Sequence, residues 1–176
     1  MKIAITGTPG IGKSTLAKRL AKSLNYDLID LNEIVKKQKL YTKYDRSLKT
    51  YVIEISDFKK YMNKYLKNKK NVILDSHLSH FIKVSMVIVL RCEPSELKKR
   101  LRKKRWSTKK VQTNVEAELM NIIANEAYSY NKKVFEIDTT GLNEEKTEKN
   151  ILKIIKSRKK QKKIDWMNIN VYKDSI

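Results

Sequence analysis

A glycine-rich loop near the start of the chain has the residue types and the spacing needed to bind phosphate groups. Residues 7–15 read GTPGIGKST and match the pattern G-x-x-x-x-G-K-[ST]. Glycines let the backbone approach a ligand closely, so that successive N–H groups can surround an anion. Lys13 can bring a positive charge to the outer phosphates, and Ser14 can offer its hydroxyl to Mg²⁺. The loop therefore predicts a nucleotide site that uses Mg²⁺.

The segments on either side of this loop support the same interpretation. Residues 2–6 form a short apolar run that is typical of a buried strand, and residues 14–24 carry leucines at helical spacing. A strand before the loop and a helix after it add the positive end of the helix to the anion site. The alternative is a glycine-rich turn with a lysine there by chance, and the flanking pattern favours phosphate binding.

A second group of polar residues follows the apolar run 71–74. Asp75 ends this predicted strand, where a carboxylate beside the phosphate loop can hold Mg²⁺ directly or through water. The alternative for Asp75 is a helix or turn cap. His77 comes two residues later and shares the side of Asp75 if the strand stays extended, so we assign it a role at the chemistry. His80 has no candidate Mg²⁺ ligand next to it and is interpreted as structural.

The order of predicted elements defines the fold class. Further strands are expected at 26–29, 84–90 and 132–138, with helices at 56–66 and 144–155 between or after them, which predicts an α/β fold with a doubly wound parallel sheet. The 176 residues suffice for one domain with a tail. The chain runs directly into a strand, which predicts no signal peptide and a cytoplasmic protein. Its one cysteine, Cys92, excludes an internal disulfide and a multi-cysteine metal site.

The segment after the second predicted strand is the candidate site for a second substrate. Asp30 is a plausible helix N-cap with Glu33 three residues later. Residues 40–55 show no clean period, but they hold three tyrosines and an aspartate. This mixture of aromatic and acidic side chains could bind a substrate. The alternative is a surface excursion with its tyrosines packed down.

A basic helical hairpin is predicted in the second half of the chain. Arg91 ends the strand 84–90, at the edge where ligands bind in open α/β sheets. A helix begins near Glu93 and becomes strongly basic, Trp106 interrupts it, and a long helix is expected over 108–130. Such a hairpin could act as a lid that closes its cations over a triphosphate. The alternative is a solvated basic face.

The charge of the chain is the second strong signal. Forty Lys and Arg against 19 Asp and Glu give a formal net charge of +21. Basic residues are densest at 98–105 and 156–163. Such a surface attracts nucleic acid through phosphate neutralisation, although lysines can also simply solvate exposed faces. The residues beyond Ser157 suggest either a tail docked on the domain or an arm that binds a partner.

Taken together, the phosphate loop, the Asp75-x-His77 strand end and the Arg100…Trp106 hairpin resemble the adenylate kinase isoenzyme 6 family over about residues 1–155. These are small nucleoside monophosphate kinases with ATPase activity, linked to maturation of the small ribosomal subunit and its 16S rRNA. The resemblance implies a P-loop kinase domain over 1–157, a monophosphate-binding segment over about 30–53, a lid over about 103–113 and a basic tail over 158–176. It implies ATP phosphates on Gly10, Gly12, Lys13, Ser14 and Thr15, with Asp75 and His77 at the chemistry.

One departure from the family pattern lies in the lid. The pattern reads R-L-x-x-R-G-aromatic, whereas here Lys104 stands in place of Arg and Arg105 in place of Gly. Because Arg and Lys are not equivalent as phosphate clamps, either Lys104 or Arg105 could make the lid contact.

Two classes of function remain open. The first is a kinase that transfers the γ-phosphoryl group of ATP to AMP or another nucleoside monophosphate, with Lys13, Asp75 and His77 as catalytic residues, Ser14 and Asp75 holding Mg²⁺, and Asp30 and Glu33 binding the monophosphate. The second is an ATPase that switches contacts in ribosome assembly and has little kinase activity. For this role the resemblance implies ribosomal protein eleven of the small subunit and rRNA as partners. A third reading is a small-molecule kinase of similar fold.

Overall fold

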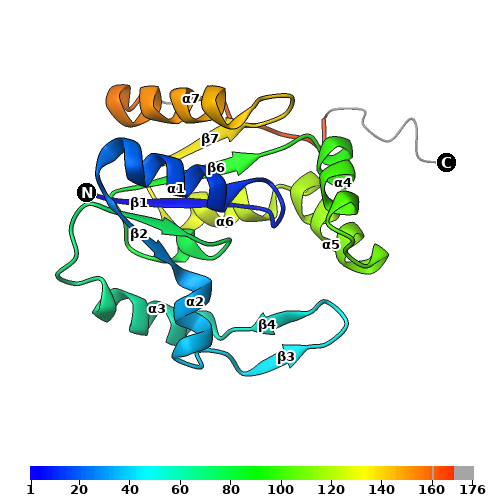
Figure 1. Ribbon diagram of the computed structural model, residues 1–176, viewed down its shortest axis with the longest axis horizontal. Coiled ribbons are helices and arrows are strands. Elements are labelled where there is room, and N and C mark those ends of the chain that lie inside the picture. Colours follow the sequence, from blue (N-terminus) through cyan, green and yellow to red (C-terminus); the bar gives the residue numbers. More distant parts are fainter. Residues whose placement is uncertain (160, 169–176) are drawn as a thin grey trace.

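A five-stranded parallel sheet forms the centre of the molecule (Figure 1). The computed structural model describes residues 1–159 and 161–168, so Lys160 of the second basic block and residues 169–176 of the tail lie outside the described residues. The strand order is β2-β5-β1-β6-β7, and each neighbouring pair is parallel. The strands are β1 (Lys2–Gly7), β2 (Asp27–Asp30), β5 (Val72–Asp75), β6 (Met86–Arg91) and β7 (Val134–Asp138). This topology confirms the predicted fold class.

Helices cover both faces of this sheet because alternate strand residues point to opposite sides. On one face, residues such as Ile3, Ile5 and Ile88 pack against α1 (Lys13–Leu24) and α7 (Glu144–Ser157). On the other, Ala4 and Val87 pack against α6 (Ile122–Tyr130). Val72 and Leu74 on that face contact a cluster with α2 (Leu31–Lys37) and α3 (Ile55–Tyr65). The strands are therefore held rigidly, and their carboxyl ends are fixed in space.

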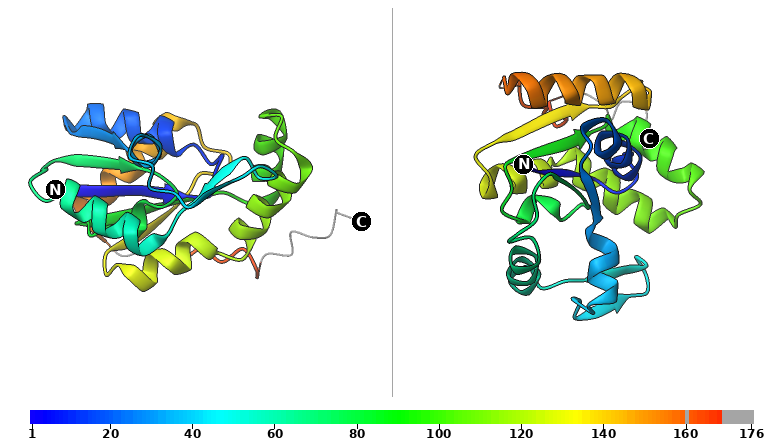
Figure 2. Two further views of the ribbon diagram at one scale, coloured as in Figure 1. Left: turned by 90° about the horizontal axis from the view of Figure 1, so that it is seen from below. Right: turned by 60° about the vertical axis from the view of Figure 1, so that its left-hand side comes forward.

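Two appendages extend beyond the carboxyl ends of the strands (Figures 1 and 2). One is the antiparallel hairpin of β3 (Lys43–Asp45) and β4 (Thr50–Val52), which explains why residues 40–55 show no helical period. The other consists of α4 (Pro94–Lys103) and α5 (Thr108–Leu119), with Trp106 in the connection between them. We call this second appendage the lid hairpin.

The prediction of one long helix over 108–130 is wrong, because the structure divides this stretch into α5 and α6. Asn121 lies between them in the left-handed region, with φ of 57°. Its side-chain amide is held on both sides, accepting from Arg91 Nη2 at 2.5 Å and donating to Asp165 Oδ1 at 3.0 Å. Asparagine tolerates this conformation better than most residues, so tertiary contacts override the helical period here.

The remaining short element is a 3₁₀ turn, η1 (Ser79–Phe81). Among the described residues, no helix combines the length and the apolar character that crossing a membrane requires.

Candidate nucleotide-binding site

The phosphate loop connects β1 to α1 and is packed too tightly for side chains at two of its glycines. A Cβ on Gly7 would lie 2.4 Å from the carbonyl oxygen of Leu90, and one on Gly10 would lie 2.2 Å from Leu101 Cδ2. Both glycines also have positive φ, 135° and 95°. Because Leu101 lies in the last turn of α4, the loop packs directly against the lid hairpin.

Lys13 is the first residue of α1 and folds back over the loop. Its ammonium donates to the carbonyl oxygen of Thr8 at 3.1 Å. Burial lowers its pKa to about 8, a change opposed by the carboxylates of Asp75 and Glu118 and reinforced by Lys104. A cation this poorly hydrated has much to gain from an anionic ligand, as expected of a phosphate-binding lysine.

Asp75 ends β5 and is only 3% exposed. Burial raises its pKa, while the Ser14 hydroxyl and the Lys13 ammonium oppose that rise. A buried carboxylate beside a hydroxyl at the mouth of a phosphate loop offers the hard oxygen ligands that Mg²⁺ prefers. The described residues contain no cluster of three or more His, Cys, Asp or Glu that could hold a metal by itself. An ion here would therefore also need ligand phosphates and water.

His77 does not continue the strand as an extended residue would, because the chain turns at Ser76. The Ser76 hydroxyl accepts the backbone N–H of Leu78 at 3.1 Å and fixes this turn. His77 nevertheless faces the site, since it lines a cleft with lid residues. Burial, followed by the charges of Lys13 and Lys110, lowers its pKa to about 4, so the ring is neutral at pH 7.

His80 is structural, as the sequence suggested. Its ring is fully buried, and Nδ1 lies 3.0 Å from the Thr6 hydroxyl. Nε2 lies 3.2 Å from Glu126 Oε2 but in poor hydrogen-bond geometry.

Two clefts open beside these residues, and the lid hairpin borders both. The first, of about 430 Å³, is lined by Gly10, Gly12 and Thr15 of the phosphate loop, by Lys103 and Lys104 of the lid, and by the start of α7. We call it the loop cleft. Of the two candidates for the lid contact, Lys104 lines this cleft, together with Arg100 and Lys103, whereas Arg105 does not. Arg105 has φ of 54°, a conformation that glycine adopts more readily than other residues.

The second cleft, of about 780 Å³, lies between the β3–β4 hairpin, α2 and the lid. We call it the hairpin cleft. Its aromatic residues are Tyr41, Tyr44, Tyr51 and Trp106, and its cations are Lys36, Lys49 and Lys110. Tyr51 packs on both other tyrosines, with ring centroids 4.5 Å and 5.0 Å apart. The tyrosines therefore line a cleft as well as packing on one another.

Neither Asp30 nor Glu33 is among the residues that line the hairpin cleft. Asp30 caps α2, its carboxylate accepting the backbone N–H groups of Asn32 at 2.8 Å and Glu33 at 3.3 Å. Among the described residues of α2, it is Asn32, Val35 and Lys36 that face the hairpin cleft. The N-cap signal indicates this segment in the sequence but not these residues. The helix α2 has only seven residues, too few for the apolar pattern to show which of its faces borders a cleft.

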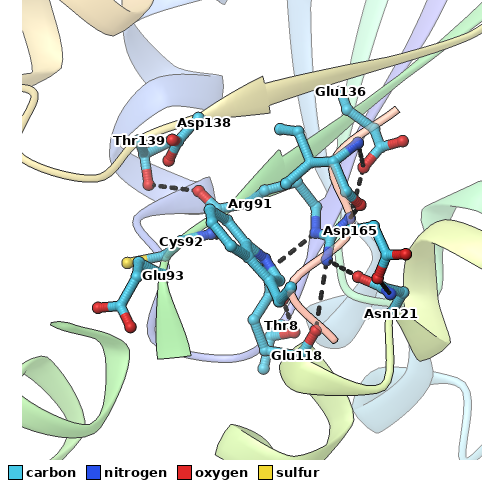
Figure 3. A network of polar contacts seen from close by, with 12 residues as sticks. Thr8, Arg91, Cys92, Glu93, Glu118, Asn121, Glu136, Asp138, Thr139 and Asp165 are labelled. Carbon is cyan, nitrogen blue, oxygen red and sulfur yellow. Dashed lines mark hydrogen bonds and ion pairs between the residues drawn. The ribbon is translucent and has the colours of Figure 1, made fainter. Parts of the chain in front are cut away.

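Arg91 lies at the carboxyl end of β6, as predicted, but its side chain is buried among protein groups. Its guanidinium is 1% exposed and lies among protein groups: the carboxylates of Glu118 and Glu136 and the amide oxygen of Asn121 (Figure 3). Its N–H groups donate to the Glu118 carboxylate at 2.8 Å and to the Asn121 amide oxygen at 2.5 Å. The sequence placed the arginine correctly but carried no local sign of its partners, which come from α5, from the connection between α5 and α6, and from β7.

A parallel sheet with a phosphate loop after its first strand and a lid hairpin over its carboxyl edge defines a P-loop protein with the α/β fold of nucleoside kinases. Solved structures share this fold: YorR of Bacillus subtilis in complex with phosphorylated GDP (TM-score 0.61, 18% identity, 89% of this chain and 96% of that chain) and deoxyadenosine kinase of M. mycoides (TM-score 0.59, 20% identity, 90% and 100%).

The sequence relationship is more specific. Residues 3–121 match the family model described as "AAA domain". The chain is 41% identical over 167 residues to a protein of Methanocaldococcus jannaschii named "Putative adenylate kinase", covering 94% of this chain and 93% of the relative. A protein of the same name from Pyrococcus abyssi is 39% identical over 171 residues, covering 96% and 93%. The chain belongs to this family of archaeal adenylate kinase-like proteins.

Proposed function

We propose that the protein transfers the γ-phosphoryl group of ATP to AMP or another nucleoside monophosphate. The observation that carries this proposal is the single lid hairpin that borders two clefts, one on the phosphate loop and one between tyrosines and lysines. Two phosphate-bearing substrates need two cationic clefts that meet at one reaction centre. The names of the archaeal relatives support the same activity.

In this proposal ATP occupies the loop cleft. Backbone N–H groups at Gly10, Gly12, Ser14 and Thr15 surround its phosphates, and the positive end of α1 faces them. Lys13 and Lys104 neutralise the outer phosphates. Asp75 and Ser14 would hold Mg²⁺. The buried carboxylate of Asp75 and the exposed hydroxyl of Ser14 offer the oxygen ligands that this ion prefers. When bound, Mg²⁺ supplies charge neutralisation on the transferred group.

The monophosphate occupies the hairpin cleft in the segment 30–53. Tyrosine rings can stack on its base, while Lys36, Lys49 or Lys110 can pair with its phosphate. Asp30, and with it Glu33, acts indirectly here by fixing the start of α2, from which Asn32 and Lys36 reach the cleft.

During transfer, the bond between the γ-phosphorus and the β–γ bridging oxygen breaks and a phosphate oxygen of the acceptor bonds to that phosphorus. ATP and AMP thus give two ADP, with no covalent protein intermediate. Because the His77 ring is neutral at pH 7, it can orient the acceptor through a ring nitrogen rather than by charge. Catalysis then consists of positioning and charge stabilisation.

Labelled AMP incubated with ATP and Mg²⁺ tests the proposal. Labelled ADP should form, and it should not form with the Lys13→Ala variant. If neither AMP nor any other nucleoside monophosphate acquires label while ATP is still hydrolysed, the kinase proposal fails and ATPase activity is the function.

That second function is supported by the net charge of +21, which exceeds what small anionic substrates require. We propose it as an additional activity: cytoplasmic ATP hydrolysis coupled to contacts with rRNA and ribosomal protein eleven of the small subunit. Its support is the family resemblance and the basic blocks 98–105 and 156–163. Faster ATP hydrolysis in the presence of small-subunit particles would support it, and an unchanged rate would contradict it.

A further inference from the structure

The C-terminal segment Ile164–Trp166 returns to the base of the phosphate loop. Trp166 is only 4% exposed, although it lies beyond the last helix. Its indole N–H donates to Glu118 Oε1 at 2.9 Å. The carbonyl oxygen of Ile164 accepts Arg91 Nη1 at 3.1 Å, and Asp165 Oδ1 accepts the Asn121 amide at 3.0 Å. Each residue of the segment thus contacts the same buried network (Figure 3).

Glu118 is the centre of that network. It lies near the end of α5 and is 2% exposed. Its Oε1 accepts Arg91 Nε at 2.8 Å, the backbone N–H of Cys92 at 3.2 Å and the indole of Trp166. A carboxylate with this many donors on one oxygen is held in one orientation. Its other oxygen, Oε2, is aimed at the phosphate loop.

There, Oε2 accepts the hydroxyl of Thr8 at 2.5 Å. Thr8 is the second residue of the phosphate loop and is fully buried. Its carbonyl oxygen accepts the backbone N–H of Ile11 at 3.3 Å and the ammonium of Lys13 at 3.1 Å. One residue thus sets both the turn of the loop and the resting place of its lysine. Glu118 also acts on Lys13 through its charge, which opposes the lowering of the lysine pKa.

We infer that Glu118 is a positioning residue for the phosphate loop, and that the segment Ile164–Trp166 fixes its orientation. The order of contacts is Trp166 to Glu118, Glu118 to Thr8, and Thr8 to Lys13. The C-terminal segment is therefore part of the machinery that binds the phosphates of ATP. This inference extends the proposed function and rests on it only for the identity of the nucleotide.

Trp166→Phe is the sharpest test, because it removes the indole donor and keeps an aromatic ring in place. The matched control is Tyr128→Phe, which removes a hydroxyl donor 3.0 Å from Glu136 Oε1, in the same network but on the side away from Thr8. Both variants lose one hydrogen bond to a buried carboxylate, so both should lower the melting temperature similarly. Affinity for a non-hydrolysable ATP analogue, measured without any acceptor, separates their roles.

Trp166→Phe should weaken analogue binding by about tenfold, the effect of one hydrogen bond to a charged group, while Tyr128→Phe binds like the wild type. In a Glu118→Gln background, Trp166→Phe should cause no further loss, because its effect passes through Glu118. Unchanged affinity in Trp166→Phe, an equal loss in Tyr128→Phe, or additive losses in the double variant would each overturn the inference. If Glu118→Gln does not fold, the comparison of Trp166→Phe with Tyr128→Phe decides alone.

These results are distinguishable from a failure of the proposed function. Analogue binding requires no acceptor, so the inference can hold in a protein that phosphorylates no monophosphate. Conversely, wild-type kinase activity combined with unchanged binding in Trp166→Phe would retain the proposed function and remove this inference.

Discussion

The loop cleft and the hairpin cleft are built in different ways. The walls of the loop cleft are the phosphate loop and the starts of two long helices, α1 and α7, packed on a buried sheet. The walls of the hairpin cleft are two strands of three residues each and a cluster of tyrosines, of which Tyr44 is 47% exposed. The loop cleft therefore lies largely against the core, whereas the hairpin cleft has only α2 on that side and is otherwise formed by the β3–β4 hairpin and the lid hairpin. Changes in the first should therefore abolish activity, whereas changes in the second should adjust the choice and affinity of the acceptor.

The largest effect is expected at Lys13. Lys13→Ala should lower turnover by about a hundredfold to a thousandfold and weaken ATP binding, because no other cation folds back over the loop from α1. Steady-state kinetics and direct binding would measure both effects. Lys22→Ala, an exposed position in the last turn of the same helix, is the matched control and should behave like the wild type. Wild-type turnover in Lys13→Ala would refute the assignment of the site.

Asp75→Asn should have the next largest effect. Loss of the carboxylate should lower turnover by about a hundredfold and raise the Mg²⁺ concentration needed for half-maximal rate. A Mg²⁺ titration of the rate would check this, with Asp27→Asn at the exposed start of β2 as the control. A rate that falls without any change in Mg²⁺ dependence would argue against Asp75 as a ligand of the ion.

His77 lines the hairpin cleft, and the charge of Lys13 contributes to the lowering of its pKa, so its variant tests the link between that cleft and the phosphate loop. His77→Ala should lower turnover by about tenfold to a hundredfold and leave ATP affinity nearly unchanged, because its contact matters mainly in the transition state. His77→Gln should recover part of the rate, since an amide can also orient the acceptor by hydrogen bonding. Equal losses in ATP affinity and turnover would place His77 in the binding of ATP instead.

Tyr51→Ala tests the hairpin cleft alone. Loss of the central ring of the tyrosine cluster should raise the KM for the monophosphate by about tenfold and leave ATP affinity unchanged. The control is Tyr65→Ala on α3, where the tyrosine is 40% exposed. If Tyr51→Ala weakens ATP rather than the acceptor, the assignment of the two clefts is reversed.

The smallest effect is a dependence of ATP affinity on pH. In the free protein Lys13 loses its charge as pH rises through about 8, well below the usual value for lysine, and bound phosphates favour the charged form. Affinity should therefore weaken by about fourfold between pH 7 and pH 8.5. Lys13→Arg should abolish this dependence, because arginine keeps its charge over that range. A wild-type profile that stays flat to pH 9 would mean that Lys13 is charged throughout.

The contrast between the clefts also explains which parts of the candidate site could be predicted from the sequence. The phosphate loop, β1 and α1 are adjacent in the chain, so the motif and its setting could be predicted together. Asp75 was found because a strand that ends in a carboxylate is a local signal. Lys49 and Lys110 line the same cleft because the β3–β4 hairpin and the lid hairpin both border it. The local sequence around each lysine does not indicate this arrangement.

The buried partners of Arg91 show the same limit more clearly. Glu118 comes from α5, Asn121 from the connection between α5 and α6, Glu136 from β7, and Trp166 from the tail. The sequence left the tail as either docked on the domain or an arm that binds a partner, and in the structure Ile164–Trp166 docks on the domain. The helix break at Asn121 escaped prediction for the same reason, since the contacts that hold it are all distant in sequence.

The two tryptophans of the chain give the molecule a pair of built-in optical probes. Trp106 is half-buried in the hairpin cleft, with Lys110 Nζ 4.6 Å from its ring centroid, whereas Trp166 is enclosed at the base of the loop. Indole emission shifts to the red when water reaches the ring. Ligand entry should therefore change the Trp106 signal, and release of the C-terminal segment should shift that of Trp166. Single-tryptophan variants would let each event be timed separately in the same protein.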